Sequence, residues 1–308
     1  MKKILFVDEK AYRFSFYYNE QTWWLENGFN AVFKSYEKKK NKWFVYLWVI
    51  FNKPQYVVFV QLSTKNIYLT KLCNLLNIKT LFWQHGVFAY DDDSINTLKK
   101  INARLNTLLC FSEFDRQQIN RYFRDVDHYK IIPHYEIEKI SKGIRRNDTF
   151  LFIGQILSKE QLKHSNARIE YDKKSEVLLN QFWDYSSQKD IKISLKKHPG
   201  DRSNYLETLQ QKFSNVTVEK DSILPKAVIG YYSTLILPYL SLGVPFIQLK
   251  HIRNKLVDFA VYDAKGIYKI DSEGDIDTVF RKVKDLEINV NQSHTFSIST
   301  ELLKNFNL

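Results

Sequence analysis

Three short motifs in the second half of the chain combine glycine, histidine and hydroxyl side chains in an order that could hold a phosphate. They are Gly154-Gln155, His198-Pro199 and Ser233-Thr234, and each follows a run that is typical of a β-strand. A strand that stops at a hydroxyl pair where a helix begins directs free backbone N–H groups and a positive dipole at an anion. A histidine at the end of a neighbouring strand can donate to the same phosphate or protonate a leaving group. The motifs therefore predict a site for a nucleotide-activated donor.

Each motif also has a structural interpretation, which the sequence leaves open. Many strands end in glycine, although Gly154 would also let the backbone approach a ligand closely. Pro199 stops the strand and fixes the turn that presents His198, yet that histidine could be purely structural. Ser233 and Thr234 could simply cap a helix. The order of the three motifs at the ends of predicted strands favours the functional interpretation.

The first half of the chain offers a candidate general base. His85 follows the strand-like run 80–84, and Gly86 permits a tight turn that would expose the imidazole. A histidine there can deprotonate an acceptor hydroxyl. Asp91, Asp92 and Asp93 could instead provide the base or bind a divalent metal, or they could be a solvated, acidic helix N-terminus. We weight His85 above the aspartates, because it lies at the corner between strand and loop.

Several other chemistries lack their signatures. The sequence has no Gly-x-Gly-x-x-Gly, Walker, Gly-x-Ser-x-Gly or zinc pattern, which argues against a dehydrogenase, NTPase or hydrolase. The five remaining histidines have no ligand spacing among them. Cys73 and Cys110 lie in apolar surroundings and are expected to be buried thiols in a reducing cytosol. We therefore expect no metal and no cofactor apart from the donor substrate.

The elements that must position these residues alternate between apolar strands and periodic helices, which indicates parallel sheets covered on both faces. Ser112, followed by an acidic first turn, predicts the start of one helix. The predicted fold class is α/β, with two Rossmann-like domains that face a cleft (the GT-B architecture). The first-half strands are expected at 3–8, 56–62, 80–84, 107–112 and 130–134, with helices around 64–77, 94–106 and 113–124. The second-half strands are expected at 149–154, 190–197, 216–220, 227–232, 245–249 and 266–270, with helices at 172–186, 203–213, 234–242, 253–260 and 275–285.

The length of 308 residues is natural for two domains. We predict an N-terminal acceptor domain over 1–134, a linker over 135–148 and a C-terminal nucleotide-donor domain over 149–308. The linker is assigned because its residues are polar and show no strand pattern. The last segment, 295–308, is expected to pack back on the first domain.

The net charge of +12 implies an anionic partner. Nucleic acid is not expected, since no recognition motif is present. An anionic bilayer or a polyanionic acceptor fits, because the basic residues 38–42 adjoin the apolar run Trp43 to Phe51, as at a membrane interface. A solvated helix end beside a core segment explains this run equally well. No stretch is long enough to span a membrane, and the N-terminus reads as a strand rather than a signal peptide.

The second-half motifs resemble the C-terminal domain of bacterial GT-B sialyltransferases and polysialyltransferases of surface glycans. The resemblance covers about residues 150–250 and implies that His198, Ser233 and Thr234 hold the cytidine monophosphate of a CMP-activated sialic-acid-type sugar. The first half departs from that family, which has an acidic pair before glycine where this chain has Gln84-His85-Gly86. A His-Gly there is similar to teichoic-acid polyol-phosphate and capsule-type transferases.

Together these observations predict a peripheral enzyme of the cytoplasmic membrane face. It would transfer a sugar to a glycan or glycolipid acceptor with inversion and without an obligatory metal. Two alternatives remain open at this stage. One is a CDP-polyol phosphotransferase, and the other is a non-catalytic glycan-binding protein.

Overall fold

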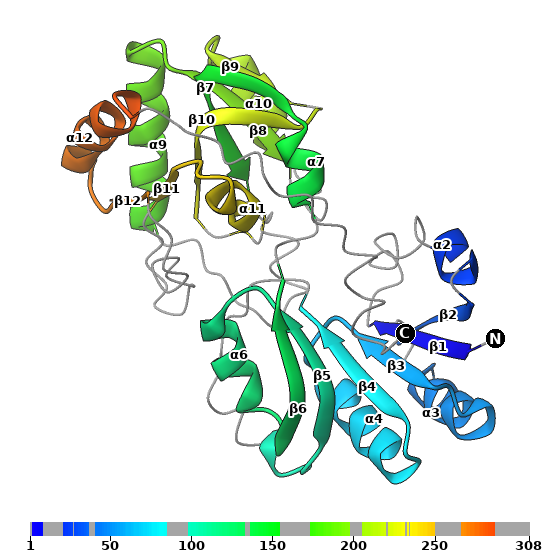
Figure 1. The fold of residues 1–308 in the computed structure, drawn as a ribbon. Coiled ribbons are helices and arrows are strands. Elements are labelled where there is room, and N and C mark those ends of the chain that lie inside the picture. Colours follow the sequence, from blue (N-terminus) through cyan, green and yellow to red (C-terminus); the bar gives the residue numbers. More distant parts are fainter. Residues whose placement is uncertain are drawn as a thin grey trace. The chain divides into compact units, whose positions relative to one another are not determined.

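The chain forms two compact α/β units in a computed structural model (Figure 1). Unit 1 comprises Met1–Ile132 with Ile298–Leu308, and unit 2 comprises Pro133–Ser297. The structure describes residues 2–8, 21–26, 28–36, 41–84, 98–132, 136–154, 173–197, 205–219, 221–231, 233, 235–249 and 266–286.

Unit 1 is built on a six-stranded sheet with the strand order β2-β1-β3-β4-β5-β6. All of its strand pairs are parallel. The strands are β1 (Lys2–Asp8), β2 (Phe29–Ser35), β3 (Tyr56–Phe59), β4 (Lys79–Trp83), β5 (Arg104–Cys110) and β6 (Asp125–Ile131). The helices are α2 (Gln21–Glu26), α3 (Asn41–Asn52), α4 (Thr64–Leu75) and α6 (Glu113–Asn120).

The strands β1, β3 and β4 of unit 1 form because their side chains are buried on both faces of the sheet. Leu5 and Val7 pack in one core cluster with residues of α3 and α4. Phe6 points to the other face, where its ring centroid lies 5.4 Å from that of Trp24 in α2. The predicted start of α6 is confirmed, since the Ser112 hydroxyl accepts a hydrogen bond from the Asp115 amide at 3.0 Å.

Unit 2 is a second six-stranded sheet, in the order β12-β11-β10-β7-β8-β9, and its strand pairs are also parallel. The strands are β7 (Ile144–Gly154), β8 (Lys192–Lys197), β9 (Val216–Val218), β10 (Ile223–Gly230), β11 (Phe246–Leu249) and β12 (Ile267–Ile270). The helices are α7 (Ile137–Ser141), α9 (Lys173–Gln188), α10 (Tyr205–Lys212), α11 (Ile236–Ser241) and α12 (Glu273–Lys284).

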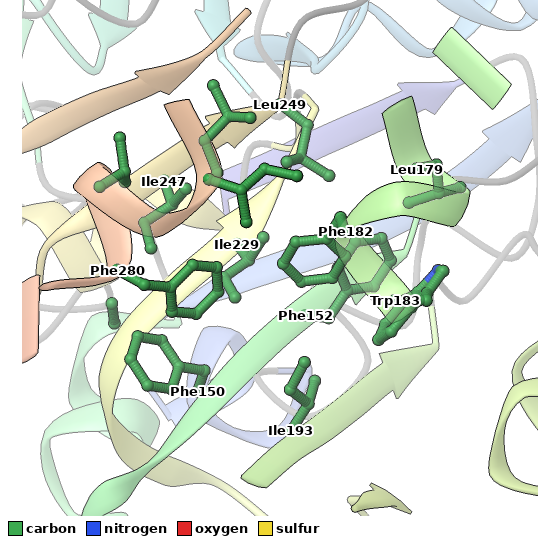
Figure 2. Packing of buried hydrophobic residues seen from close by; sticks show 14 of the residues in the cluster. Phe150, Phe152, Leu179, Phe182, Trp183, Ile193, Ile229, Ile247, Leu249 and Phe280 are labelled. Atoms are coloured by element: carbon green, nitrogen blue, oxygen red, sulfur yellow. The ribbon is translucent and has the colours of Figure 1, made fainter. Parts of the chain in front are cut away.

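The core of unit 2 is rich in aromatic rings that join the sheet to α9 and α12 (Figure 2). Phe152 of β7 lies 5.0 Å from Trp183 of α9, between ring centroids, and Phe150 lies 5.0 Å from Phe280 of α12. Phe182 and Phe280 complete this layer, with their ring centroids 5.8 Å apart. Large rings of this kind bury much apolar area per residue, so they hold the two helices firmly on one face of the sheet. The opposite face carries α7 and α11.

Most predicted strands and helices are observed within a few residues. The residues that we predicted to be a linker, 135–148, instead contain a helix and the first part of a strand. Residues 137–141 form α7, and β7 begins at Ile144 rather than at residue 149. The polar stretch 144–146 is a strand because it pairs in parallel with the first residues of β10, from Ile223 to Pro225. The strand β2 and the helices α2 and α3 were not predicted, and residues 104–106, which were assigned to a helix, belong to β5. The predicted helix at 253–260 and the final segment 295–308 lie outside the described residues.

The described helices do not include one that is long and apolar enough to cross a bilayer.

Candidate functional site

The carboxyl ends of three central strands in unit 2 lie side by side. Gly154 at the end of β7 pairs with Lys197 at the end of β8, and β10, which ends at Gly230, pairs with β7 on its other side. A Cβ atom on Gly230 would stand 3.1 Å from the carbonyl oxygen of Ile153, which is tighter than an ordinary contact, so β10 and β7 approach each other closely there. In open parallel sheets, ligands bind at this carboxyl edge. The strands that precede all three predicted motifs therefore end at one place, which we call the carboxyl edge of unit 2.

Ser233 follows β10 at this edge and organises the turn into α11. Its buried hydroxyl accepts a hydrogen bond from the Leu235 amide at 3.3 Å, and its carbonyl accepts one from the Ile236 amide at 3.0 Å. The hydroxyl keeps its own proton, which it can donate to an anion. Ser233 thus holds the turn that precedes α11, and its role as a phosphate ligand stays a prediction.

The helix after Ser233 differs from the predicted one. We expected it over 234–242, whereas α11 begins at Ile236 and has six residues. Few peptide dipoles add up over so short a helix, and the amide of Leu235 is already bonded to Ser233. The expected contribution of the helix dipole to anion binding is therefore small, and side-chain groups must provide more of the positive charge.

The turn between β10 and Ser233 is held from the neighbouring strand. The side-chain amide of Gln248 in β11 donates to the carbonyl oxygen of Tyr231 at 3.2 Å. Tyr231 itself is buried in the main core cluster of unit 2. This bond and this packing fix the path of the chain as it leaves β10, which is what a binding loop on a rigid scaffold requires.

Lys196 is a cationic group at the carboxyl edge that the sequence interpretation did not single out. It is half-buried near the end of strand β8. Burial lowers the pKa of its ammonium below the usual 10.5, and the nearby carboxylates Glu136 and Glu219 partly oppose this effect. Glu219 also pairs with Arg146, at 3.0 Å between nitrogen and oxygen. A buried lysine with a lowered pKa near strand ends is a candidate ligand for a negatively charged group.

The sequence pattern of β8 could have predicted the face of the sheet to which Lys196 points. Ile193 and Leu195 alternate along β8 and are both buried in the aromatic core. Because side chains on a strand alternate between its faces, Lys196 must point to the other face, which carries α7 and α11.

In unit 1, Gln84 marks the end of β4, where the predicted base His85 follows. Gln84 is fully buried, and its side-chain oxygen accepts a hydrogen bond from the Phe111 amide at 2.8 Å. The backbone amide of Gln84 donates to the backbone carbonyl of Leu109, also at 2.8 Å. Gln84 therefore ties the ends of β4 and β5 together and fixes the point from which the chain continues to His85.

The structure describes two of the predicted site residues, namely the backbone of Gly154 and the whole of Ser233. The others lie outside the described residues, so their roles stay predictions. They are His85, Asp91, Asp92, Gln155, His198, Pro199 and Thr234.

The two cysteines are inert thiols, as predicted. Cys73 and Cys110 are both free and buried. Burial raises the pKa of each thiol to about 12, so neither provides a thiolate at neutral pH. Among the described side chains, no group of three histidine, cysteine or carboxylate residues is arranged to hold a metal ion.

A pocket of about 630 Å³ lies elsewhere in unit 2, between α9, α12 and the amino-terminal parts of the strands. Four of its charged residues form ion pairs, Lys192 with Asp148 and Arg281 with Asp277. Tyr185 donates to Asp277 at 2.8 Å, and Lys192 lies 2.8 Å from Asp148. We therefore regard this pocket as part of the packing of α12 and not as the candidate site.

No protein-family model matches the chain, and no curated protein matches its sequence. Solved structures do match its fold. UDP-GlcNAc 2-epimerase from Methanocaldococcus jannaschii, in complex with UDP-GlcNAc and UDP, has a TM-score of 0.60 at 10% identity and covers 100% of this chain and 99% of that one. The same enzyme from Neisseria meningitidis, bound to UDP-GlcNAc, has a TM-score of 0.61 at 9% identity, with 100% of both chains covered.

The spinosyn rhamnosyltransferase SpnG, complexed with thymidine diphosphate, has a TM-score of 0.59 at 10% identity and covers 100% of both chains. At such low identity the likeness establishes the fold and no more. The chain has the GT-B fold that its sequence predicted, with two parallel-sheet, Rossmann-like domains.

Proposed function

We propose that this protein is a glycosyltransferase that moves a sugar from a nucleotide-activated donor to a glycan or glycolipid acceptor. The observation that carries the proposal is the convergence of the ends of β7, β8 and β10 at the carboxyl edge of unit 2. The matching solved structures hold UDP-GlcNAc, UDP or thymidine diphosphate, which supports a nucleotide sugar as the substrate class.

The donor phosphates would bind at this edge. Gly154 leaves room for a close backbone approach, and Ser233 has a hydroxyl proton to donate. His198 would stand directly after Lys197, with the half-buried Lys196 one residue further back. Two cationic groups at one strand end can balance the charge that builds up on the leaving phosphate.

The reaction itself would be a single in-line displacement. His85, or Asp91 or Asp92, takes the proton from the acceptor hydroxyl, whose oxygen then forms a bond to the anomeric carbon of the donor sugar. The bond between that carbon and the phosphate oxygen breaks, and its electron pair leaves with the nucleotide. His198 stabilises or protonates the departing phosphate. One displacement inverts the configuration at the anomeric carbon.

The nucleotide is the least determined part of the proposal. The resemblance in residues 150–250 favours a CMP-activated, sialic-acid-type donor, whereas the matching structures hold uridine and thymidine nucleotides. The first experiment is therefore a thermal-shift screen of the purified chain with CMP, CDP, UDP, GDP and dTDP. A ligand that binds only the folded protein raises its melting temperature, so we expect one nucleotide base to stand out.

Two pairs of variants connect that shift to the carboxyl edge. His198→Ala and Ser233→Ala should lose the nucleotide-induced shift. The matched controls, His128→Ala on β6 of unit 1 and Ser241→Ala at the last residue of α11, change exposed residues and should keep it. A shift that survives both His198→Ala and Ser233→Ala would contradict the proposed donor site. No shift with any nucleotide would instead favour the non-catalytic glycan-binding protein.

A second candidate function is epimerisation of the sugar on its nucleotide, because several of the matching structures are UDP-GlcNAc 2-epimerases. The two activities differ in what they need. An epimerase converts UDP-GlcNAc to its C2 epimer without any acceptor, which chromatography of the nucleotide sugars would detect. A transferase releases free nucleotide only as the acceptor gains mass, and the added mass separates sugar transfer from polyol-phosphate transfer.

A further inference from the structure

Helix α3 in unit 1 presents a row of large apolar side chains to solvent. Phe51 is 80% exposed, Phe44 67% and Trp43 61%, and Leu47 and Ile50 are also exposed. Their spacing of three, four and seven residues places them on one side of an α-helix. We call these five residues the apolar stripe of α3. Soluble proteins rarely leave contiguous apolar surface of this kind uncovered without a binding function.

The stripe is not needed to hold the helix on its own domain. Val45 and Val49 point inward and are buried, in a cluster with Leu5 and Val57 of the sheet. Tyr46 and Trp48 pack at the border of the same cluster. Helix α3 is thus apolar all round, with one side in the core and the other side exposed.

The stretch of sequence that contains the stripe is rich in lysine and, from residue 38 to residue 90, lacks carboxylates. Residues 38–90 contain eight lysines. Among the described side chains, Lys53 is exposed directly after the helix, the Lys34 ammonium lies 5.4 Å from the Trp48 ring centroid, and the Lys3 ammonium lies 3.5 Å from the side-chain oxygen of Asn52. An apolar surface with cations beside it and no anions in the same stretch of sequence is complementary to a negatively charged, partly apolar partner.

We propose that the apolar stripe of α3 binds the surface of an anionic phospholipid bilayer. Helix α3 has 12 residues and is about 18 Å long, which is short of the roughly 30 Å of a hydrocarbon core. It would therefore lie in the plane of the interface, with Trp43, Phe44 and Phe51 among the acyl chains and the lysines at the headgroups. This inference rests on unit 1 alone and does not depend on the proposed donor site.

A bilayer fits the stripe better than a second copy of the chain does. Symmetric pairing of two α3 helices would bring two lysine-rich, carboxylate-free segments together, and like charges across an interface oppose association. Anionic headgroups instead neutralise each lysine near the surface.

The test is co-sedimentation of the full chain with vesicles of phosphatidylcholine, with and without phosphatidylglycerol. We expect binding to the phosphatidylglycerol vesicles and weaker binding at high salt, because salt screens the lysine charges. The double variant Phe44→Ser/Phe51→Ser should bind at least about tenfold more weakly, since it removes two of the most exposed apolar groups. Its melting temperature should stay close to wild type, because neither side chain is in the core.

Val177→Ser is the matched control, because it removes an exposed apolar side chain from α9 of unit 2. It should leave vesicle binding unchanged. Equal vesicle binding by the wild type and the double variant would overturn the proposal. So would a wild-type dimer that the double variant converts to monomer while vesicle binding is absent, since that would assign the stripe to a second copy. Nucleotide-induced thermal shifts should be the same in all three proteins, so failure here is distinguishable from failure of the donor site.

Discussion

At the scale of single residues, Lys196 shows how a strand end acquires a functional group. Ile193 and Leu195 point from β8 into the aromatic core, so Lys196 points to the opposite face of the sheet. Its side chain is only partly shielded from solvent. Burial disfavours the charged ammonium, and this effect outweighs the favourable field of Glu136 and Glu219. A negatively charged ligand at the carboxyl edge would raise this pKa back toward its usual value and so would favour the charged ammonium.

Lys196→Met should change how stability depends on pH. In the folded chain the pKa of Lys196 lies below 10.5, so between that pKa and 10.5 the unfolded chain binds more protons than the folded one. The free energy of unfolding contributed by this residue therefore rises with pH in that window. Relative to wild type, Lys196→Met should be most stable below the window and lose its advantage as the pH approaches 10.5. Urea denaturation over a pH series measures this difference.

Lys192→Met is the control for this prediction and should have the opposite sign. Lys192 lies at the start of β8, beside the pocket under α12, and its hydrogen bond to Asp148 raises its pKa. Its contribution to stability is present below the unfolded pKa and is lost as the pH rises through the folded pKa. If the stability differences of both variants varied with pH in the same direction, the assignment of Lys196 as a partly desolvated lysine would be wrong.

At the scale of elements, the turn between α7 and β7 depends on one glycine. A Cβ atom on Gly143 would stand 2.6 Å from the carbonyl oxygen of Ser222 and 2.9 Å from that of Ile140. Both are backbone atoms, so they cannot swing away as a side chain could. The amide of Ile144, the next residue, donates to that same Ser222 carbonyl at 3.0 Å, which begins the pairing of β7 with β10.

Gly143→Ala should therefore destabilise the protein by about 1–3 kcal/mol, as overpacking against fixed atoms typically does. Gly274→Ala is the matched control, because a Cβ there meets only the Ser272 hydroxyl, at 3.9 Å, inside helix α12. Gly274 lies in the first turn of α12, where the preference for alanine is weaker than in a helix interior, so that change should leave the stability within about 0.5 kcal/mol of wild type. Equilibrium urea denaturation measures the free energy of unfolding of both variants. Equal stabilities for the two would show that the turn can relax.

The same turn explains what could and could not be predicted from the sequence. Strands such as β3 and β10 were predictable because continuous apolar runs signal a sheet buried on both faces. The first part of β7 was not, because Arg145 and Arg146 look like a linker and become strand only through pairing with Leu224 and Pro225, far along the chain. At the candidate site, the positions of the glycines at strand ends were predictable. The bond from the Leu235 amide to Ser233 was not, because the register of a short helix depends on its packing.

At the scale of the whole molecule, the described core clusters each draw on one unit only. Phe82 packs with residues of β5 and α6 in unit 1, whereas Phe152 packs with α9 in unit 2. Each unit therefore has its own source of hydrophobic stabilisation, which is the property expected of a separately folding domain.

We expect two unfolding transitions in calorimetry, one for each unit. Phe82→Ala and Phe152→Ala remove fully buried rings, so each should destabilise its own unit by about 3–5 kcal/mol and lower one transition only. The nucleotide identified in the thermal-shift screen should raise the transition that Phe152→Ala lowers, because the donor site is proposed in unit 2. A single transition lowered equally by both variants would contradict independent folding.

The separation of the cores also bears on how such a chain could diversify. Unit 1 comprises Met1–Ile132 together with Ile298–Leu308, so it is encoded in two pieces that flank unit 2. A genetic exchange that replaced one half cleanly would need two crossover points, one near residue 132 and one near residue 297. Point substitutions need none, and those confined to the surface of unit 1 would leave the packing of unit 2 intact. Substitutions at the surface of one unit are thus the change that disturbs the described cores least.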